Sequence, residues 1–166
     1  MIGVLLLACS AVPGPVPADP ASGRRATAEA VDTAPERIVT TRSSGSGRSV
    51  EAGWEPEALG SRLLAIEGGR TRVLVDASWN ADRPALSDDG RWVAFVSGRS
   101  GFASVWIVAF EGGEPRQLTN VGVAREKGAT GAPAGFVPPP VDGSLRFDGE
   151  ALTWTGPDGE TRRVTP

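Results

Sequence analysis

The hydrophobic pattern in the second half of this 166-residue chain has a period of two, that of a strand, rather than the 3.6 of a helix. Every second residue of 91–97 (RWVAFVS) falls on the same face of an extended strand, so this segment predicts a β-strand. Residues 103–110 (ASVWIVAF) are almost continuously apolar and rich in β-branched side chains, which is typical of an inner strand covered on both faces. Glycine-bearing turns at 97–101 and 111–114 separate these strands from each other and from a short outer strand at 115–119. The pattern predicts an antiparallel meander.

The same piece of sequence recurs along the chain. Residues 64–75 (LAIEGGRTRVLV) align without a gap on residues 108–119 (VAFEGGEPRQLT), 44 positions later. A third, partial copy at 159–165 (GETRRVT) lies 46 positions after residues 113–119. Each copy has a predicted strand, a tight turn and an Arg-x-Leu or Arg-x-Val pattern. A repeat of about 40–45 residues is the length of a four-stranded propeller blade.

Residues 83–119, which run RPALSDDGRWVAFVS, then a glycine turn, VWIVAF and GGEPRQLT, resemble one full blade of a TolB-type β-propeller. This resemblance implies an all-β fold, an incomplete β-propeller of about two to three blades of antiparallel meander sheet. Residues 59–166 supply about two and a half blades at this repeat length, whereas a closed ring normally needs 4–8 blades. We therefore expect an open β assembly. A ring completed by further copies or by a partner, and a truncated propeller remnant, remain as alternatives.

The segment Ser87, Asp88, Asp89 and Gly90 predicts a structural turn between two strands. Serine and aspartate side chains hydrogen-bond to their own backbone in turns, and glycine accepts the positive φ that such turns require. The alternative for the two carboxylates is a calcium site shared with Asp82. We favour the turn and expect no metal site.

The beginning of the chain resembles a bacterial lipoprotein signal. Residues 1–8 are apolar and uncharged, too few to span a bilayer, and Leu6-Leu7-Ala8-Cys9 resembles the lipobox of that family. The resemblance implies a signal peptide at 1–8, a lipidated Cys9, and a position in the cell envelope, at the outer membrane facing the periplasm. A signal peptide begins with basic residues, so we expect the true start to lie upstream of Met1. The alternative is an ordinary apolar N-terminus with a buried cysteine.

Between this signal and the repeats the composition changes to proline, alanine, serine, glycine and threonine. Such a segment buries too little apolar surface to offset the entropy of ordering it. We therefore expect residues 9–57 to form a disordered tether and residues 58–166 to form the propeller-like domain.

Composition limits the chemistry. The chain has no histidine, a single cysteine and a net charge of −3, which excludes histidine-based catalysis and gives no field that attracts nucleic acid. The interpretation is a non-enzymatic module without cofactors that binds an envelope protein, with self-association as a further option. Trp54, Trp79 and Trp92 are the candidate partner contacts, and filling between sheets is their alternative role. The rival functions are a glycan-binding module and an enzyme-associated propeller module.

Overall fold

The computed structural model describes residues 38–125 and 127–166. Within these residues the strands form three antiparallel sheets, and all of them belong to one compact unit of the chain, Ala34–Pro166. The first sheet has the order β1-β2-β3-β4, the second β5-β6-β7-β8 and the third β11-β10-β9. The strands are β1 (Ile38–Gly45), β2 (Arg48–Glu55), β3 (Gly60–Glu67), β4 (Arg70–Val75), β5 (Asp82–Leu86), β6 (Trp92–Ser97), β7 (Ser104–Ala109), β8 (Arg116–Gln117), β9 (Arg146–Asp148), β10 (Ala151–Thr155) and β11 (Thr161–Val164), and a short 3-10 turn, η1 (Ala77–Trp79), links the first two sheets.

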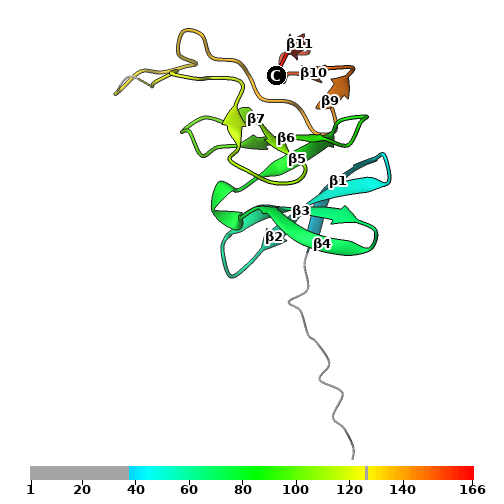
Figure 1. Cartoon of the computed structure of the whole chain (residues 1–166). Coiled ribbons are helices and arrows are strands. Elements are labelled where there is room, and N and C mark those ends of the chain that lie inside the picture. The colour runs from blue at the N-terminus through cyan, green and yellow to red at the C-terminus, as the bar shows by residue number, and fades with distance from the viewer. Residues whose placement is uncertain (1–37, 126) are drawn as a thin grey trace, which may run out of the picture. The chain divides into compact units, whose positions relative to one another are not determined.

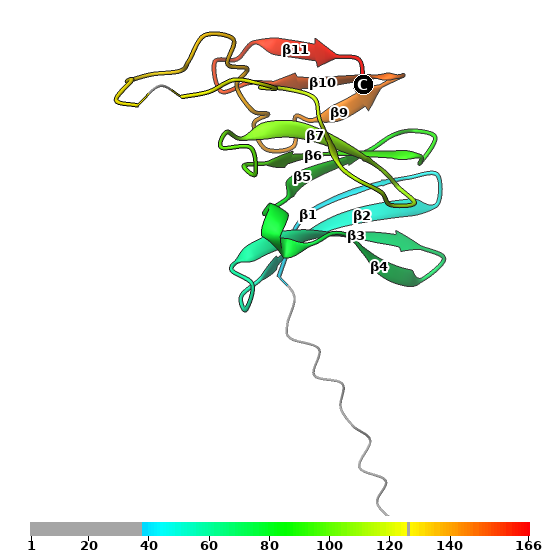
Figure 2. The ribbon, with the colours of Figure 1, turned by 60° about the vertical axis from the view of Figure 1, so that its left-hand side comes forward.

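The three sheets are stacked face to face, with the second sheet in the middle (Figures 1 and 2). Two separate hydrophobic clusters hold the stack together. The first lies between the first and second sheets and includes Leu63 and Phe95, and the second lies between the second and third sheets and includes Ala94 and Trp154. The middle sheet is therefore covered on both faces.

Alternate residues of β6 and β7 serve different clusters, as the period of two predicted. Phe95 and Val108 pack in the first cluster, whereas Ala94 and Val105 pack in the second. The side chains of β7 from Ser104 to Val108 are all buried, so the prediction of an inner strand covered on both sides is confirmed.

The predicted boundary at residues 57 and 58 falls too late, because the first sheet already begins with β1 and β2. Ser46 and Gly47 both have positive φ (51° and 71°), which gives the tight two-residue turn that joins the two strands. In β2 the side chains that enter the core are the small Val50 and Ala52, and the Ser-Gly composition around the turn is also that of a flexible linker. Residues 9–37 of the predicted tether lie outside the described residues.

The Glu-Gly-Gly turn forms differently in its two copies. In the first copy the glycines 68–69 make a two-residue hairpin turn, and β4 pairs with β3 directly from this turn, where Arg70 faces Glu67. In the second copy the glycines 112–113 have φ of 110° and 121°, and pairing resumes only where Ile107 faces Arg116. Pro115 has no N–H to donate and a fixed φ, so the outer strand cannot pair close to this turn. The second copy therefore turns slightly earlier than predicted, where the N–H of Gly112 donates to the carbonyl of Ala109 at 2.9 Å, and its outer strand is shorter than the predicted 115–119.

The third sheet has three strands because proline occupies the position of a fourth. Asp142-Gly143 is the counterpart of the turn residues Asp89-Gly90, and the segment before it contains Pro138–Pro140 where the second sheet has β5. Prolines cannot donate ladder hydrogen bonds, so this segment forms no strand. It is held instead by the indole of Trp154, whose Nε1 donates to the carbonyl of Pro138 at 3.2 Å.

One arginine fastens the first sheet to the turns of the second. The guanidinium of Arg48 binds the carboxylates of Glu67 at 2.8 Å and Glu111 at 2.7 Å, and donates to the carbonyl of Gly90 at 2.9 Å. Its guanidinium carbon also lies 4.5 Å from the centre of the Phe110 ring. These contacts hold the β5–β6 turn of the second sheet in place, and this turn forms one end of the cleft described next.

Candidate binding cleft

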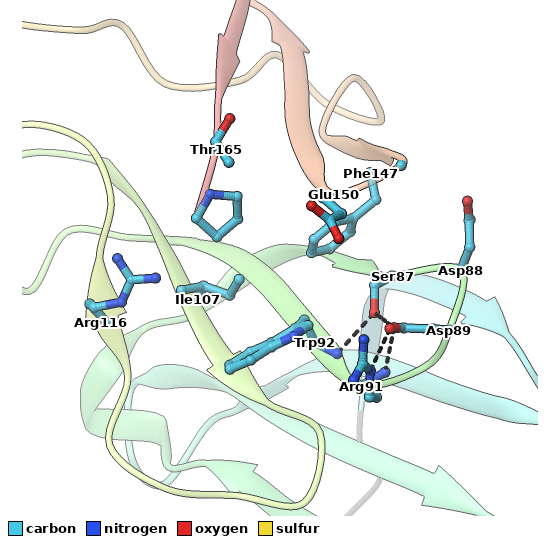
Figure 3. Close-up of a pocket in the computed structure, with 12 residues that line it drawn as sticks. Ser87, Asp88, Asp89, Arg91, Trp92, Ile107, Arg116, Phe147, Glu150 and Thr165 are labelled. Atoms are coloured by element: carbon cyan, nitrogen blue, oxygen red, sulfur yellow. Dashed lines mark hydrogen bonds and ion pairs between the residues drawn. The ribbon is translucent and has the colours of Figure 1, made fainter.

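A cleft of about 430 Å³ lies between the second and third sheets (Figure 3). The second sheet forms one wall from the β5–β6 turn, β6, β7 and β8. The third sheet forms the other wall from β9, the β9–β10 turn and the residues after β11. The lining residues are Ser87, Asp88, Asp89, Arg91, Trp92, Ile107, Arg116, Phe147, Gly149, Glu150, Thr165 and Pro166.

The predicted turn residues form one end of the cleft. The carboxylate of Asp89 accepts hydrogen bonds from the Ser87 hydroxyl at 2.7 Å and from the Arg91 backbone N–H at 3.0 Å. The Ser87 oxygen in turn accepts from the backbone N–H of Trp92 at 2.9 Å. Gly90 has φ of +70°, and a Cβ there would lie 3.0 Å from the Arg48 side chain. This network fixes where β6 begins, and so where the side chain of Trp92 enters the cleft.

The hydrogen bond from Ser87, followed by those from the backbone and side chain of Arg91, lowers the pKa of Asp89 to about 2. The ionised carboxylate is therefore the form that stabilises the turn.

Asp89→Ala should lower the melting temperature at pH 7, because the Ser87 hydroxyl and the Arg91 N–H lose their common acceptor. The folded-state pKa lies below the ordinary value of 3.8, so this contribution is complete above about pH 4 and is lost as the pH falls through about 2. The difference in melting temperature between wild type and variant should shrink over that range in a pH series. Asp88→Ala is the matched control, because Asp88 is exposed and its carboxylate has no hydrogen bond in the described part of the chain. A difference that is constant from pH 7 to pH 2 would contradict this role.

Aromatic and aliphatic side chains form the middle of the cleft. Trp92 is 43% exposed, although it begins a strand whose other residues are buried. Ile107 is buried beside it on β7, and the half-buried Phe147 faces them from β9 (Figure 3). An exposed indole next to two apolar side chains is a surface that gains free energy when a ligand covers it.

Charged side chains stand at the two ends of this apolar strip. In the order β5-β6-β7-β8, the turn with Asp88 and Asp89 lies at one side of the second sheet, and Arg116 lies on the outer strand β8 at the other. Glu150 of the β9–β10 turn lies near the acidic end (Figure 3). Arg91 is paired with Asp89 at 2.5 Å.

The three tryptophans that the sequence suggested as contacts occupy different environments. Trp92 lines the cleft. Trp79 is 9% exposed and packs edge-to-face on Trp106, with ring centres 5.0 Å apart, so its proposed role as an exposed contact is wrong. Trp54 is half-buried at the end of β2, where its backbone faces Ser61. The 3-10 turn η1 explains the burial of Trp79, because it directs this side chain into the core between the first two sheets.

The carboxylates proposed as an alternative calcium site do not converge. Asp82 lies opposite Val96 at the start of β5, whereas Asp88 and Asp89 follow the other end of that strand. In the residues that the structure describes, no group of three or more histidine, cysteine, aspartate or glutamate side chains is placed to hold a metal ion. None of the described segments is a helix with the length and apolarity needed to cross a membrane. Cys9 lies outside the described residues.

Arg116, Phe147 and Glu150 are cleft residues that the sequence did not single out. They come from β8, β9 and the turn after β9, so they lie up to 63 positions from Ser87 in the chain. The only signal for their proximity was the repeat itself, which places successive blades next to each other. Their convergence depends on how the second and third sheets pack, which no single window of sequence contains.

Comparisons with known proteins agree with the architecture. No family model matches the sequence. A segment of 117 residues, 63% of this chain, is 35% identical to tricorn protease homolog 2 of Streptomyces coelicolor, and the match covers 10% of that protein. The chain thus spans about a tenth of the length of this curated relative.

Among solved structures, TolB from Acinetobacter baumannii matches 78% of this chain and 33% of its own chain, with a TM-score of 0.51 and 14% identity. A crystal structure of the tricorn protease matches 75% of this chain and 12% of its own, with a TM-score of 0.47 and 15% identity. The prediction of an all-β, incomplete β-propeller is confirmed, and the chain has the fold of a TolB-like β-propeller of which the described residues form three stacked sheets.

Proposed function

We propose that this chain is a non-catalytic binding module and that the cleft between its second and third sheets is its contact surface for another protein. The observation that carries the proposal is the exposed indole of Trp92 at the centre of a cleft of about 430 Å³, next to the buried Ile107. Tryptophan and arginine are enriched among the residues that dominate protein interfaces, and this cleft contains both. A volume of this size lies within the range of ordinary ligand sites.

The chemistry of the cleft supports binding rather than catalysis. The chain has no histidine to act as a general base, and its single cysteine is Cys9. The pKa of Asp89 is about 2, so this carboxylate is ionised and hydrogen-bonded at neutral pH and is a poor proton donor. The remaining polar groups of the cleft are suited to holding a ligand by charge and hydrogen bonds.

A photo-crosslinking experiment in cells tests the contact surface. A benzophenone amino acid in place of Trp92 should give one stoichiometric adduct with an envelope protein, because this side chain lies in the proposed interface. The same amino acid in place of Val73 is the matched control, since Val73 is 51% exposed but lies on β4 of the first sheet. Adducts of the same identity and yield from both positions, or none from position 92, would remove the cleft from the interaction. Adducts of the chain with itself would instead indicate self-association.

We further propose that the module is held at the cell envelope by lipid on Cys9, at the outer membrane facing the periplasm. The support is the resemblance of residues 6–9 to a lipobox. Several acyl chains together give stable membrane attachment where a single chain does not.

Metabolic labelling with palmitate should modify the full chain, and Cys9→Ser should abolish the label and release the protein from the membrane fraction. Ser10→Ala is the control and should keep both. Label that persists in Cys9→Ser would contradict the anchor.

A second function, a peptidase-associated propeller module, is favoured by the 35% identity to a tricorn protease homologue. The crosslinked partner distinguishes the two. A partner that cleaves peptides would support the peptidase-associated role, and a partner without such activity would support a binding platform alone.

A further inference from the structure

The cleft carries acidic side chains at one end and a basic side chain at the other, measured across the strands of the second sheet. The Asp88–Asp89 turn, Trp92, Ile107 and Arg116 come from the β5–β6 turn, β6, β7 and β8, which are successive positions in that sheet. Neighbouring strands lie about 4.8 Å apart, so the strip from the turn to the outer strand is about 15 Å long. Its acidic and basic ends are separated by apolar surface.

The charges that remain available to a ligand are opposite at the two ends. Arg91 neutralises Asp89 through their ion pair at 2.5 Å. Among the described residues, Asp88, Glu150 and Arg116 form no ion pair with another side chain. Among the side chains that line the cleft, the acidic end therefore keeps two carboxylates and the basic end keeps one guanidinium.

The middle of the strip favours an apolar group. The exposed face of Trp92 lies beside Ile107 and below Phe147 (Figure 3). A large apolar side chain placed there would cover the exposed face of the indole.

We propose that the cleft binds an extended peptide segment of the partner, with a basic residue at the Asp88 and Glu150 end, a large apolar residue on Trp92 and an acidic residue at Arg116. This inference rests on the proposed protein-binding function and adds the charge pattern of the bound segment. An extended chain advances about 3.3 Å per residue, so the two charges lie about four residues apart. A nucleic acid carries negative charge along its whole length and would be repelled at the acidic end.

Three capped five-residue peptides test the charge pattern against the full chain by fluorescence anisotropy. They are Lys-Ser-Phe-Ser-Glu, Glu-Ser-Phe-Ser-Glu and Lys-Ser-Phe-Ser-Lys. The first should bind about fivefold more tightly than either of the others, which is the effect expected of one partly exposed charge pair. Equal affinity of the three peptides, or no binding of any, would overturn the proposal.

Charge-reversal variants then locate the two ends. Arg116→Glu should make the doubly basic peptide the preferred ligand, and Glu150→Lys should raise the affinity for the doubly acidic one. Arg70→Glu is the matched control for Arg116→Glu, because Arg70 is exposed on β4 of the first sheet and its reversal makes the same change in net charge. All three variants should melt as wild type does. An Arg116→Glu variant with unchanged preference would overturn the proposal, and if crosslinking from position 92 still captures the partner, the protein-binding function would stand without it.

Discussion

Gly60→Ala should lower the free energy of unfolding by about 3 kcal/mol, which is a large part of the total stability of a domain of this size. The Cβ of an alanine at this position would lie 2.2 Å from the carbonyl oxygen of Ala77. That oxygen belongs to η1 and already accepts a hydrogen bond from the N–H of Asn80 at 3.0 Å. The neighbouring N–H of Ser61 donates to the Asn80 side chain at 3.2 Å, so the start of β3 and the 3-10 turn cannot separate without losing these bonds.

Thermal and urea unfolding measure this effect, and a fall of about 10 °C in the melting temperature is expected. Gly98→Ala is the matched control, because Gly98 is exposed, has no positive φ and would place its Cβ more than 4 Å from any atom outside residues 97–99. The control should change stability by less than about 0.5 kcal/mol. If Gly60→Ala and Gly98→Ala have the same melting temperature, the close packing of η1 on β3 is incorrect.

Trp79→Ala should destabilise the fold by about 3–5 kcal/mol, because it removes a large aromatic side chain from the core between the first two sheets. The indole is 9% exposed and makes edge-to-face contacts with Phe95 at 6.3 Å and Trp106 at 5.0 Å between ring centres. Arg99 covers it from outside, with the guanidinium carbon 4.4 Å from the ring centre.

Trp92→Ala is the matched comparison, since it makes the same chemical change at a side chain that is 43% exposed. Urea unfolding should show a loss of about 1 kcal/mol or less for this variant. The pair separates a tryptophan that stabilises the core from one that is available to a partner. Equal losses of stability would remove that distinction and with it the assignment of Trp92 to a contact surface.

The two inner strands of the second sheet, β6 and β7, could be predicted because their side chains carry a strong pattern. Residues 91–97 place apolar side chains on both faces of a strand, and 103–110 are almost continuously apolar because the strand is buried on both faces. The first hairpin lacked such a signal. Its core positions hold small residues, Val50 and Ala52, and its turn is a Ser-Gly pair within a segment that has the composition of a linker.

The candidate cleft could be predicted only in part. The turn residues and Trp92 lie within one repeat and could be found from local sequence. Arg116 also lies in this repeat, but its position in the cleft depends on the pairing of β8 with β7. This pairing begins only after Pro115, at Arg116. Phe147 and Glu150 belong to the next repeat, and their approach to Trp92 depends on how far the third sheet is rotated on the second.

Trp79 shows a different limit of local sequence. Its neighbours Asp76, Ser78 and Asn80 are polar, and the sequence left open whether the indole is a partner contact or packs between sheets. These polar groups form the turn that directs the indole inward: the Asp76 carboxylate accepts from the Ser78 N–H at 2.8 Å. The direction of this side chain therefore depends on a turn that the sequence analysis did not predict.

The position of β6 between two cores separates the effects of neighbouring residues. Phe95 contributes to packing on the first sheet and Ala94 to packing on the third, although the two are adjacent in sequence. A substitution at one of these positions alters one interface and leaves the other with its own contacts. Each junction in the stack can thus be strengthened or loosened independently by changes to the same six-residue strand.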